Sequence, residues 1–97
     1  MIDAVDAIDE AIDQFREAVR LEDMYQVVLH NDDVNSMEHV VLCLMRVFGH
    51  SQELAVRIML EAHHTGQAVA EVEPEAPARL HRDQLESFGL AATVEKV

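Results

Sequence analysis

Cysteine pairs, basic side chains and long apolar runs are missing or scarce in this sequence. The single cysteine, Cys43, cannot form an internal disulfide, and its apolar helical neighbours predict a buried thiol in a reducing compartment. No stretch approaches the roughly 20 apolar residues of a membrane span, and the acidic N-terminus is unlike the basic start of a signal peptide. We therefore expect a cytoplasmic protein that does not enter a membrane.

Basic residues are outnumbered by acidic ones, 7 against 19, which gives the chain a net charge of −12. Such a charge repels nucleic acids and anionic membranes and favours cationic partners. Hydrophobic residues, in contrast, make up 49% of the 97 residues, which is the composition of one globular domain. The composition thus predicts a single folded domain that binds neither nucleic acid nor lipid.

The first quarter of the chain has the pattern of an amphipathic helix. Its apolar residues recur every three or four positions and so fall on one narrow seam: Ile2, Val5, Ile8, Ile12, Phe15 and Val19. We predict an N-terminal helical extension over residues 1–23, followed by a core domain over residues 24–97. The seam could cover the chain's own domain, pair with a second copy or dock on another protein.

Three strands and three helices are expected in the core domain. Strands are predicted at residues 24–29, 67–72 and 90–94, from short β-branched or apolar runs that end at turn residues. Two helices form a tight hairpin, one running from an N-cap at Asn35 to Gly49 and the next from Ser51 to Gly66. The first of these is hydrophobic on most sides, which predicts burial. A third helix is expected from Pro77 to Ser87. The order predicts an α+β fold, β-α-α-β-α-β, with helices on one face of a small antiparallel or mixed sheet.

Polar residues crowd the turn between the first strand and the first core helix. A peptide's α-ammonium has three donors and no acceptors, so it requires acceptors such as those that Asn31, Asp33 and neutral His63 carry. If the two hairpin helices lie side by side, Met59 and Met37 can add an apolar surface next to this turn. The alternative interpretation is an Asx-rich turn that satisfies only its own backbone.

Other chemistry has weaker support in the sequence. The six histidines do not show a metal-ligand spacing such as H-E-x-x-H, and the only cysteine lies mid-helix. Asp32 and Asp33 are adjacent and point apart in an extended chain, and no Ser or Cys is paired with a base. We therefore expect no enzyme activity, no metal and no cofactor, with a metal-dependent enzyme as the remaining alternative. The methionines of the core domain can fill its core or form a binding surface.

Four stretches together resemble the ClpS family of N-degron adaptors: YQVVLHNDDVNSMEHVV at 25–41, VFGHSQELA at 47–55, IMLEAHHTG at 58–66 and GLAATVEK at 89–96. The resemblance implies a non-enzymatic adaptor that binds proteins beginning with Phe, Tyr, Trp or Leu and delivers them to a Clp-family AAA+ ATPase, ClpA-like or ClpC-like. It also implies a ClpS-like fold with a three-stranded sheet. The alternative is a regulatory or protein-interaction module of the same fold that does not recognise N-terminal peptides.

The resemblance also implies roles for individual residues. Asn31, Asp33 and His63 correspond to the positions that hold the substrate's α-amino group. The hydrophobic pocket corresponds to six further positions, with Met37 as a gate against β-branched side chains: Asn35, Met37, Val40, Met59, Ala62 and Leu90.

Three departures from the family pattern stand out. Ser36 replaces the usual proline, as in the cyanobacterial and actinobacterial branch. Ala62 replaces the usual valine, which predicts a wider pocket or a weaker hold on a leucine side chain. The segment at residues 72–82 differs from the stretch associated with docking on the ATPase.

Overall fold

The computed structural model describes residues 23–97. The predicted amphipathic helix lies outside these residues, so the division into an extension of residues 1–23 and a core of residues 24–97 stays a prediction. None of the helices in the described part of the chain is long and apolar enough to cross a membrane.

Three antiparallel strands form the sheet, with β1 (Met24–His30) between β2 (Gln67–Pro74) and β3 (Ala92–Lys96). The sheet resolves the choice between an antiparallel and a mixed arrangement that the sequence left open. Pairing on both edges suits the apolar sequence of β1, where Val27 and Leu29 belong to the hydrophobic core. The predicted first and second strands are confirmed, whereas the third begins two residues later than expected.

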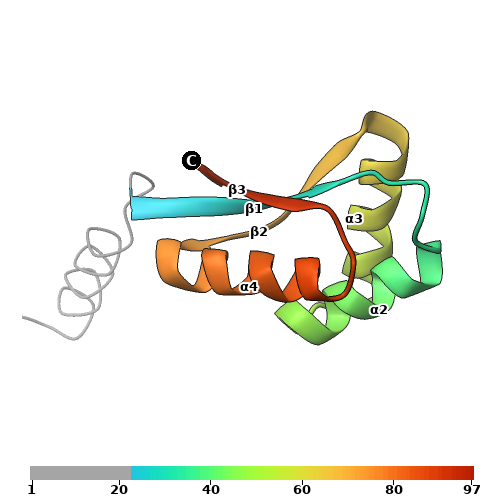
Figure 1. Cartoon of the computed structure of the whole chain (residues 1–97), viewed down its shortest axis with the longest axis horizontal. Helices are drawn as coiled ribbons and strands as arrows, with labels where there is room; N and C mark the ends of the chain where they lie inside the picture. Colours follow the sequence, from blue (N-terminus) through green and yellow to red (C-terminus); the bar gives the residue numbers. More distant parts are fainter. Residues whose placement is uncertain (1–22) are drawn as a thin grey trace, which may run out of the picture.

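The helices α2 (Met37–Phe48), α3 (Gln52–Thr65) and α4 (Glu75–Ser87) lie on one side of the sheet (Figure 1). The α2–α3 hairpin sits near the His30 end of β1, and α4 packs along the strands. Gly49 and Gly66 end the first two helices with φ angles of 72° and 98°, in the left-handed region that glycine adopts without a steric penalty. The order β-α-α-β-α-β and the α+β class are as predicted.

Two helix starts differ from the predicted ones. Ser36, and not Asn35, is the N-cap of α2, because the Ser36 hydroxyl accepts a hydrogen bond from the His39 amide. Helix α4 begins at Glu75, two residues before the predicted start at Pro77. Proline is tolerated there because the amides of a first helical turn have no partner within the helix.

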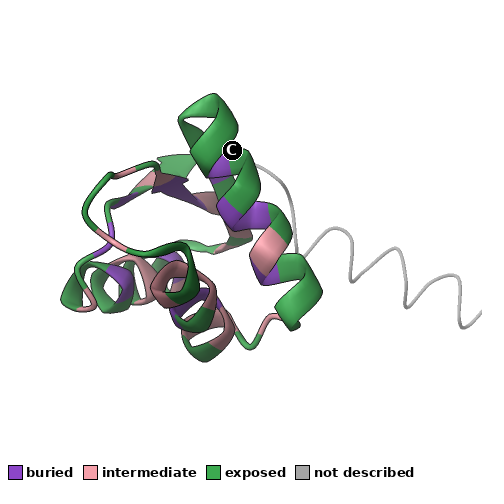
Figure 2. Ribbon diagram, turned by 90° about the vertical axis from the view of Figure 1, so that its right-hand side faces the viewer, coloured by how far each residue is buried: buried purple, intermediate pink, exposed green. Residues whose placement is uncertain are grey.

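The core lies between the sheet and the helices, where the buried positions gather (Figure 2). The prediction that α2 is a buried helix is only half right. Cys43 and Leu44 are buried, but Leu42 exposes 64% of its surface and Met37 exposes 47%. Helix α2 therefore turns one apolar face into the core and leaves another open beside α3.

Candidate functional site

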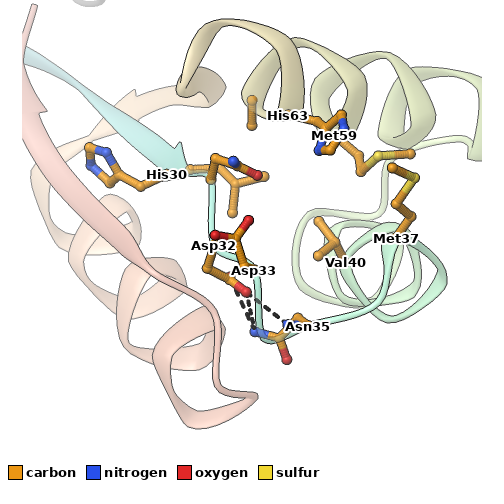
Figure 3. Close-up of a pocket in the computed structure, with 11 residues that line it drawn as sticks. His30, Asp32, Asp33, Asn35, Met37, Val40, Met59 and His63 are labelled. Atoms are coloured by element: carbon orange, nitrogen blue, oxygen red, sulfur yellow. Dashed lines mark hydrogen bonds between the residues drawn. The ribbon is translucent and has the colours of Figure 1, made fainter.

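A cavity of about 220 Å³ opens where β1 ends, between the turn that follows it and the α2–α3 hairpin (Figure 3). One wall comes from the end of β1 and the polar turn, and the other wall comes from the apolar sides of the two helices. The residues that line it are Leu29, His30, Asn31, Asp32, Asp33, Asn35, Met37, Val40, Met59, Ala62 and His63. The cavity thus contains all three predicted α-amino-binding residues and five of the six predicted pocket residues.

Asp32 organises the turn. Its Oδ1 accepts hydrogen bonds from the Val34 and Asn35 backbone amides at 3.0 and 2.8 Å, and the Asn35 side-chain amide donates to both carboxylate oxygens at 3.2 Å (Figure 3). Burial alone would raise the pKa of Asp32, but the hydrogen bonds from Asn35 and Val34 hold that pKa below its ordinary value. Asp32 is therefore an ionised carboxylate whose oxygens are already engaged in hydrogen bonds within the turn.

Asn35 ties this turn to a distant part of the chain. Besides its bonds to Asp32, its side-chain amide donates to the Gly89 carbonyl at 2.8 Å, in the loop before β3. Asn35 therefore connects the turn to that loop through hydrogen bonds. The sequence had predicted that Asn35 caps α2. The interpretation of the turn as Asx-rich and self-satisfied holds for Asp32 and Asn35.

The side chains of the three predicted ammonium acceptors, unlike that of Asp32, are not engaged in hydrogen bonds within the described residues. The backbone N–H of Asn31 donates a hydrogen bond to the Gly66 carbonyl at 2.9 Å. This bond fixes the backbone of the turn against the end of α3, where His63 lies. Within residues 23–97, the side chains of Asn31, Asp33 and His63 take part in none of the hydrogen bonds that the structure contains. Their polar atoms are thus free to face a ligand.

Apolar side chains form the opposite wall of the cavity. Met59 and Ala62, one turn apart on α3, expose only 8% and 2% of their surfaces. Met37 and Met59 extend toward one another from the two helices of the hairpin (Figure 3), and Val40 lies one turn along α2 from Met37. The wall can therefore receive an apolar group beside the polar turn.

Leu90 is the predicted pocket residue that does not line the cavity. It is 3% exposed and belongs to the hydrophobic core, because the chain turns inward after Gly89 before β3 begins. Conversely, Leu29, His30 and Asp32 line the cavity and were not predicted for the site. The His30 ring points away and bonds Thr93 at 2.8 Å, so this residue contributes its backbone. Leu29 and His30 lie at the end of β1, next to the turn, and this position was the signal in the sequence that could have identified them.

Elsewhere the described residues offer little for catalysis. Burial raises the pKa of the Cys43 thiol, against a smaller lowering effect of Arg46, so this buried cysteine is a poor nucleophile. Among residues 23–97, no three His, Cys, Asp or Glu side chains gather as metal ligands would. The chemistry of the cavity is that of a small binding site in which polar side chains from the turn and from the end of α3 adjoin an apolar surface.

Comparison with known proteins identifies the family. The family model of the ATP-dependent Clp protease adaptor protein ClpS matches residues 20–93. The chain belongs to the ClpS family. It is therefore an adaptor of the Clp protease and not an enzyme, as the sequence predicted.

Cyanobacterial ClpS proteins are among its relatives, in agreement with the predicted branch. The ClpS adapter of Prochlorococcus marinus is 41% identical over 73 residues, which cover 74% of this chain and 70% of the relative. That of Synechococcus elongatus is 44% identical over 72 residues, which cover 73% of this chain and 76% of the relative.

A solved ClpS structure shares the fold. It is Agrobacterium tumefaciens ClpS2 bound to L-phenylalaninamide, and it aligns with a TM-score of 0.69 at 32% sequence identity. The alignment covers 78% of this chain and 99% of that protein. This similarity confirms the predicted ClpS-like α+β architecture.

Proposed function

We propose that this adaptor recognises N-degrons, that is, the free α-amino group and bulky hydrophobic first side chain of substrate proteins. The observation that carries the proposal is the cavity in which unengaged acceptors and an apolar wall meet. The ligand of the similar Agrobacterium protein, L-phenylalaninamide, combines the same two chemical features, a free amine and an aromatic side chain. The proposed ligand therefore has one group for the polar part of the cavity and one for the apolar part.

The amine contacts Asn31, Asp33 and His63 in this proposal. Asn31 offers its amide oxygen, Asp33 a carboxylate and neutral His63 a ring nitrogen, which together match the three N–H donors of an ammonium. Charge-assisted hydrogen bonds of this kind are about twice as strong as neutral ones. An acetylated N-terminus has no positive charge and too few donors for these acceptors.

The first side chain enters the apolar part of the cavity, which supports substrates beginning with Phe, Tyr, Trp or Leu. Met37, Val40, Met59 and Ala62 line that part, and Met37 acts as the gate. Burial of a side chain of this size contributes about 1.5–3 kcal/mol relative to leaving it in water. A substrate that begins with Ala or Ser would lack this contribution.

Delivery of the bound substrate to a Clp-family AAA+ ATPase, ClpA-like or ClpC-like, completes the proposal. Membership in the Clp protease adaptor family supports this partner class. The single cysteine, Cys43, is buried and unpaired within the described residues, which suits the reducing cytoplasm.

A peptide series that varies only the first residue tests the proposal. Peptides with a fluorescent label at the C-terminus are titrated with the adaptor, and their Kd values are measured by fluorescence anisotropy. We expect Phe, Tyr, Trp and Leu at position 1 to bind at least tenfold more tightly than Ala, Ser or Glu. Equal Kd values across the series would instead indicate the regulatory or interaction module without N-terminal recognition.

A further inference from the structure

A second hollow lies between α2 and α3, directly beside the first cavity. It has a volume of about 510 Å³, and its lining is mostly apolar. Helix α2 contributes Val41, Leu42 and Met45, and helix α3 contributes Val56. We refer to this hollow as the hairpin groove. Leu42, with 64% of its surface exposed, is its most exposed apolar side chain.

The hairpin groove is continuous with the first cavity. Met37 and Met59, the methionine pair visible in Figure 3, line both hollows and so lie at their junction. A peptide held by its amine at the polar turn, with its first side chain against this pair, can leave the cavity across the same pair. Two further hollows, one between α3 and β2 and one beside Phe88, share no lining residue with the first cavity.

We propose that the hairpin groove receives the side chain of the third residue of the bound peptide. This inference rests on the proposed N-degron function. In an extended peptide, side chains 1 and 3 point to the same side and are separated by about 7 Å, whereas side chain 2 points to the other side. A peptide whose first side chain enters the cavity therefore turns its third side chain toward the groove.

The lining predicts which third residues are preferred. The residues that line the groove are apolar apart from Glu38 and Gln52, so Leu, Ile, Met or Val suits it. An acidic third residue would meet the carboxylate of Glu38 on a chain that already has a net charge of −12. The adaptor thus reads position 3 in addition to position 1.

The test compares C-terminally labelled peptides that begin Phe-Ala-Leu, Phe-Ala-Ser, Phe-Leu-Ser and Ala-Ala-Leu. Their Kd values are measured with the wild type, with Leu42→Ser and with the control Leu80→Ser. Both leucines are exposed positions on helices, but Leu80 lies on α4, away from the groove. Leu42 does not line the first cavity, so its replacement leaves the proposed amine and side-chain contacts intact.

We expect the Phe-Ala-Leu peptide to bind about fivefold more tightly than Phe-Ala-Ser, both to the wild type and to Leu80→Ser. In Leu42→Ser this ratio falls toward one, while the Kd of Phe-Ala-Ser is unchanged. Equal Kd values for the two peptides, or a larger gain from leucine at position 2, overturn the inference and leave the proposed function standing.

Two further outcomes also overturn the inference. If Phe-Ala-Leu binds no more tightly than Ala-Ala-Leu, the proposed function itself fails, and the inference fails with it. If Leu42→Ser leaves the peptide ratio unchanged but weakens a dimer in analytical ultracentrifugation, a second copy of the chain occupies the groove.

Discussion

Asp32 and Asp33 are neighbours in the sequence but serve different purposes in the turn. Asp32 accepts the amides of Val34 and Asn35, whereas the Asp33 carboxylate stays free within the described residues. We predict that Asp32→Ala lowers the free energy of unfolding by about 1–2 kcal/mol, because it removes hydrogen bonds that the turn requires. Asp33→Ala should change the free energy of unfolding by no more than about 0.5 kcal/mol relative to the wild type. It should weaken binding of the Phe-peptide at least tenfold. Urea titration and fluorescence anisotropy measure the two effects.

The stability effects of these two variants should also differ in their dependence on pH. Because the folded pKa of Asp32 lies below its ordinary value, its stabilisation is complete above about pH 4 and is lost as the pH falls through the folded pKa. The difference in unfolding free energy between the wild type and Asp32→Ala should therefore shrink below that pH. A difference that stays constant down to pH 2.5, or a larger stability loss in Asp33→Ala, would contradict the assignment.

Ala62 is the smallest side chain that lines the cavity. It lies in the apolar wall and is 2% exposed, so Ala62→Val adds two methyl groups to a space of about 220 Å³. We expect the variant to bind a Trp-peptide several-fold more weakly relative to a Leu-peptide than the wild type does, because the larger ring loses room. Competition binding with the two peptides measures the ratio. An unchanged ratio would mean that Ala62 does not contact the first side chain.

Most of the residues that line the cavity were predictable because they lie close together in the sequence or on one helix face. The predicted acceptors Asn31 and Asp33 lie in one turn, and Met59 and His63 are one helical turn apart. The predicted cap at Asn35 was wrong, and Leu90 does not line the cavity, because the environments of these two residues are not local. The Asn35 amide bonds a carbonyl 54 positions away, and Leu90 turns into the core at a loop that no periodic pattern describes.

At the scale of elements, the start of α2 connects the polar turn to the apolar wall. We predict that Ser36→Ala costs about 1 kcal/mol and speeds hydrogen exchange at the His39 amide, because the capping acceptor is lost. Asn35→Ala should also destabilise the protein, through the lost bond to Gly89, but should leave the exchange at His39 nearly unchanged. Hydrogen exchange followed by NMR separates the two. Faster exchange at His39 in Asn35→Ala alone would restore Asn35 as the cap.

Element positions followed from the sequence where capping and periodicity agreed. Ser51 and Gly66 bound α3 as predicted, since a side-chain acceptor and a left-handed glycine mark its two ends. Helix α4 was less predictable, because it starts after Pro74 without a side-chain cap and contains Pro77 in its first turn. The exposure of Leu42 was likewise hidden in the sequence, since an apolar residue looks the same whether it faces a core or a groove.

For the whole molecule, charge should govern the approach of substrates. With a net charge of −12, the adaptor attracts cationic peptides at long range, and salt weakens this attraction by screening the charges. We expect a Phe-peptide with lysines at positions 6–8 to associate faster than its glutamate counterpart at 20 mM salt, with the difference largely lost at 500 mM. Stopped-flow fluorescence measures both rates. Rates that are independent of salt would contradict electrostatic steering by the molecule.

We propose that the cavity beside β1 binds a free α-amino group together with a bulky first side chain. Two peptides that begin with Phe and differ only in N-terminal acetylation probe this binding mode directly. Fluorescence anisotropy should give a Kd at least a hundredfold weaker for the acetylated peptide, because acetylation removes the charge and the donors that Asn31, Asp33 and His63 would accept. Equal Kd values for the two peptides would show that the cavity does not recognise the free α-amino group.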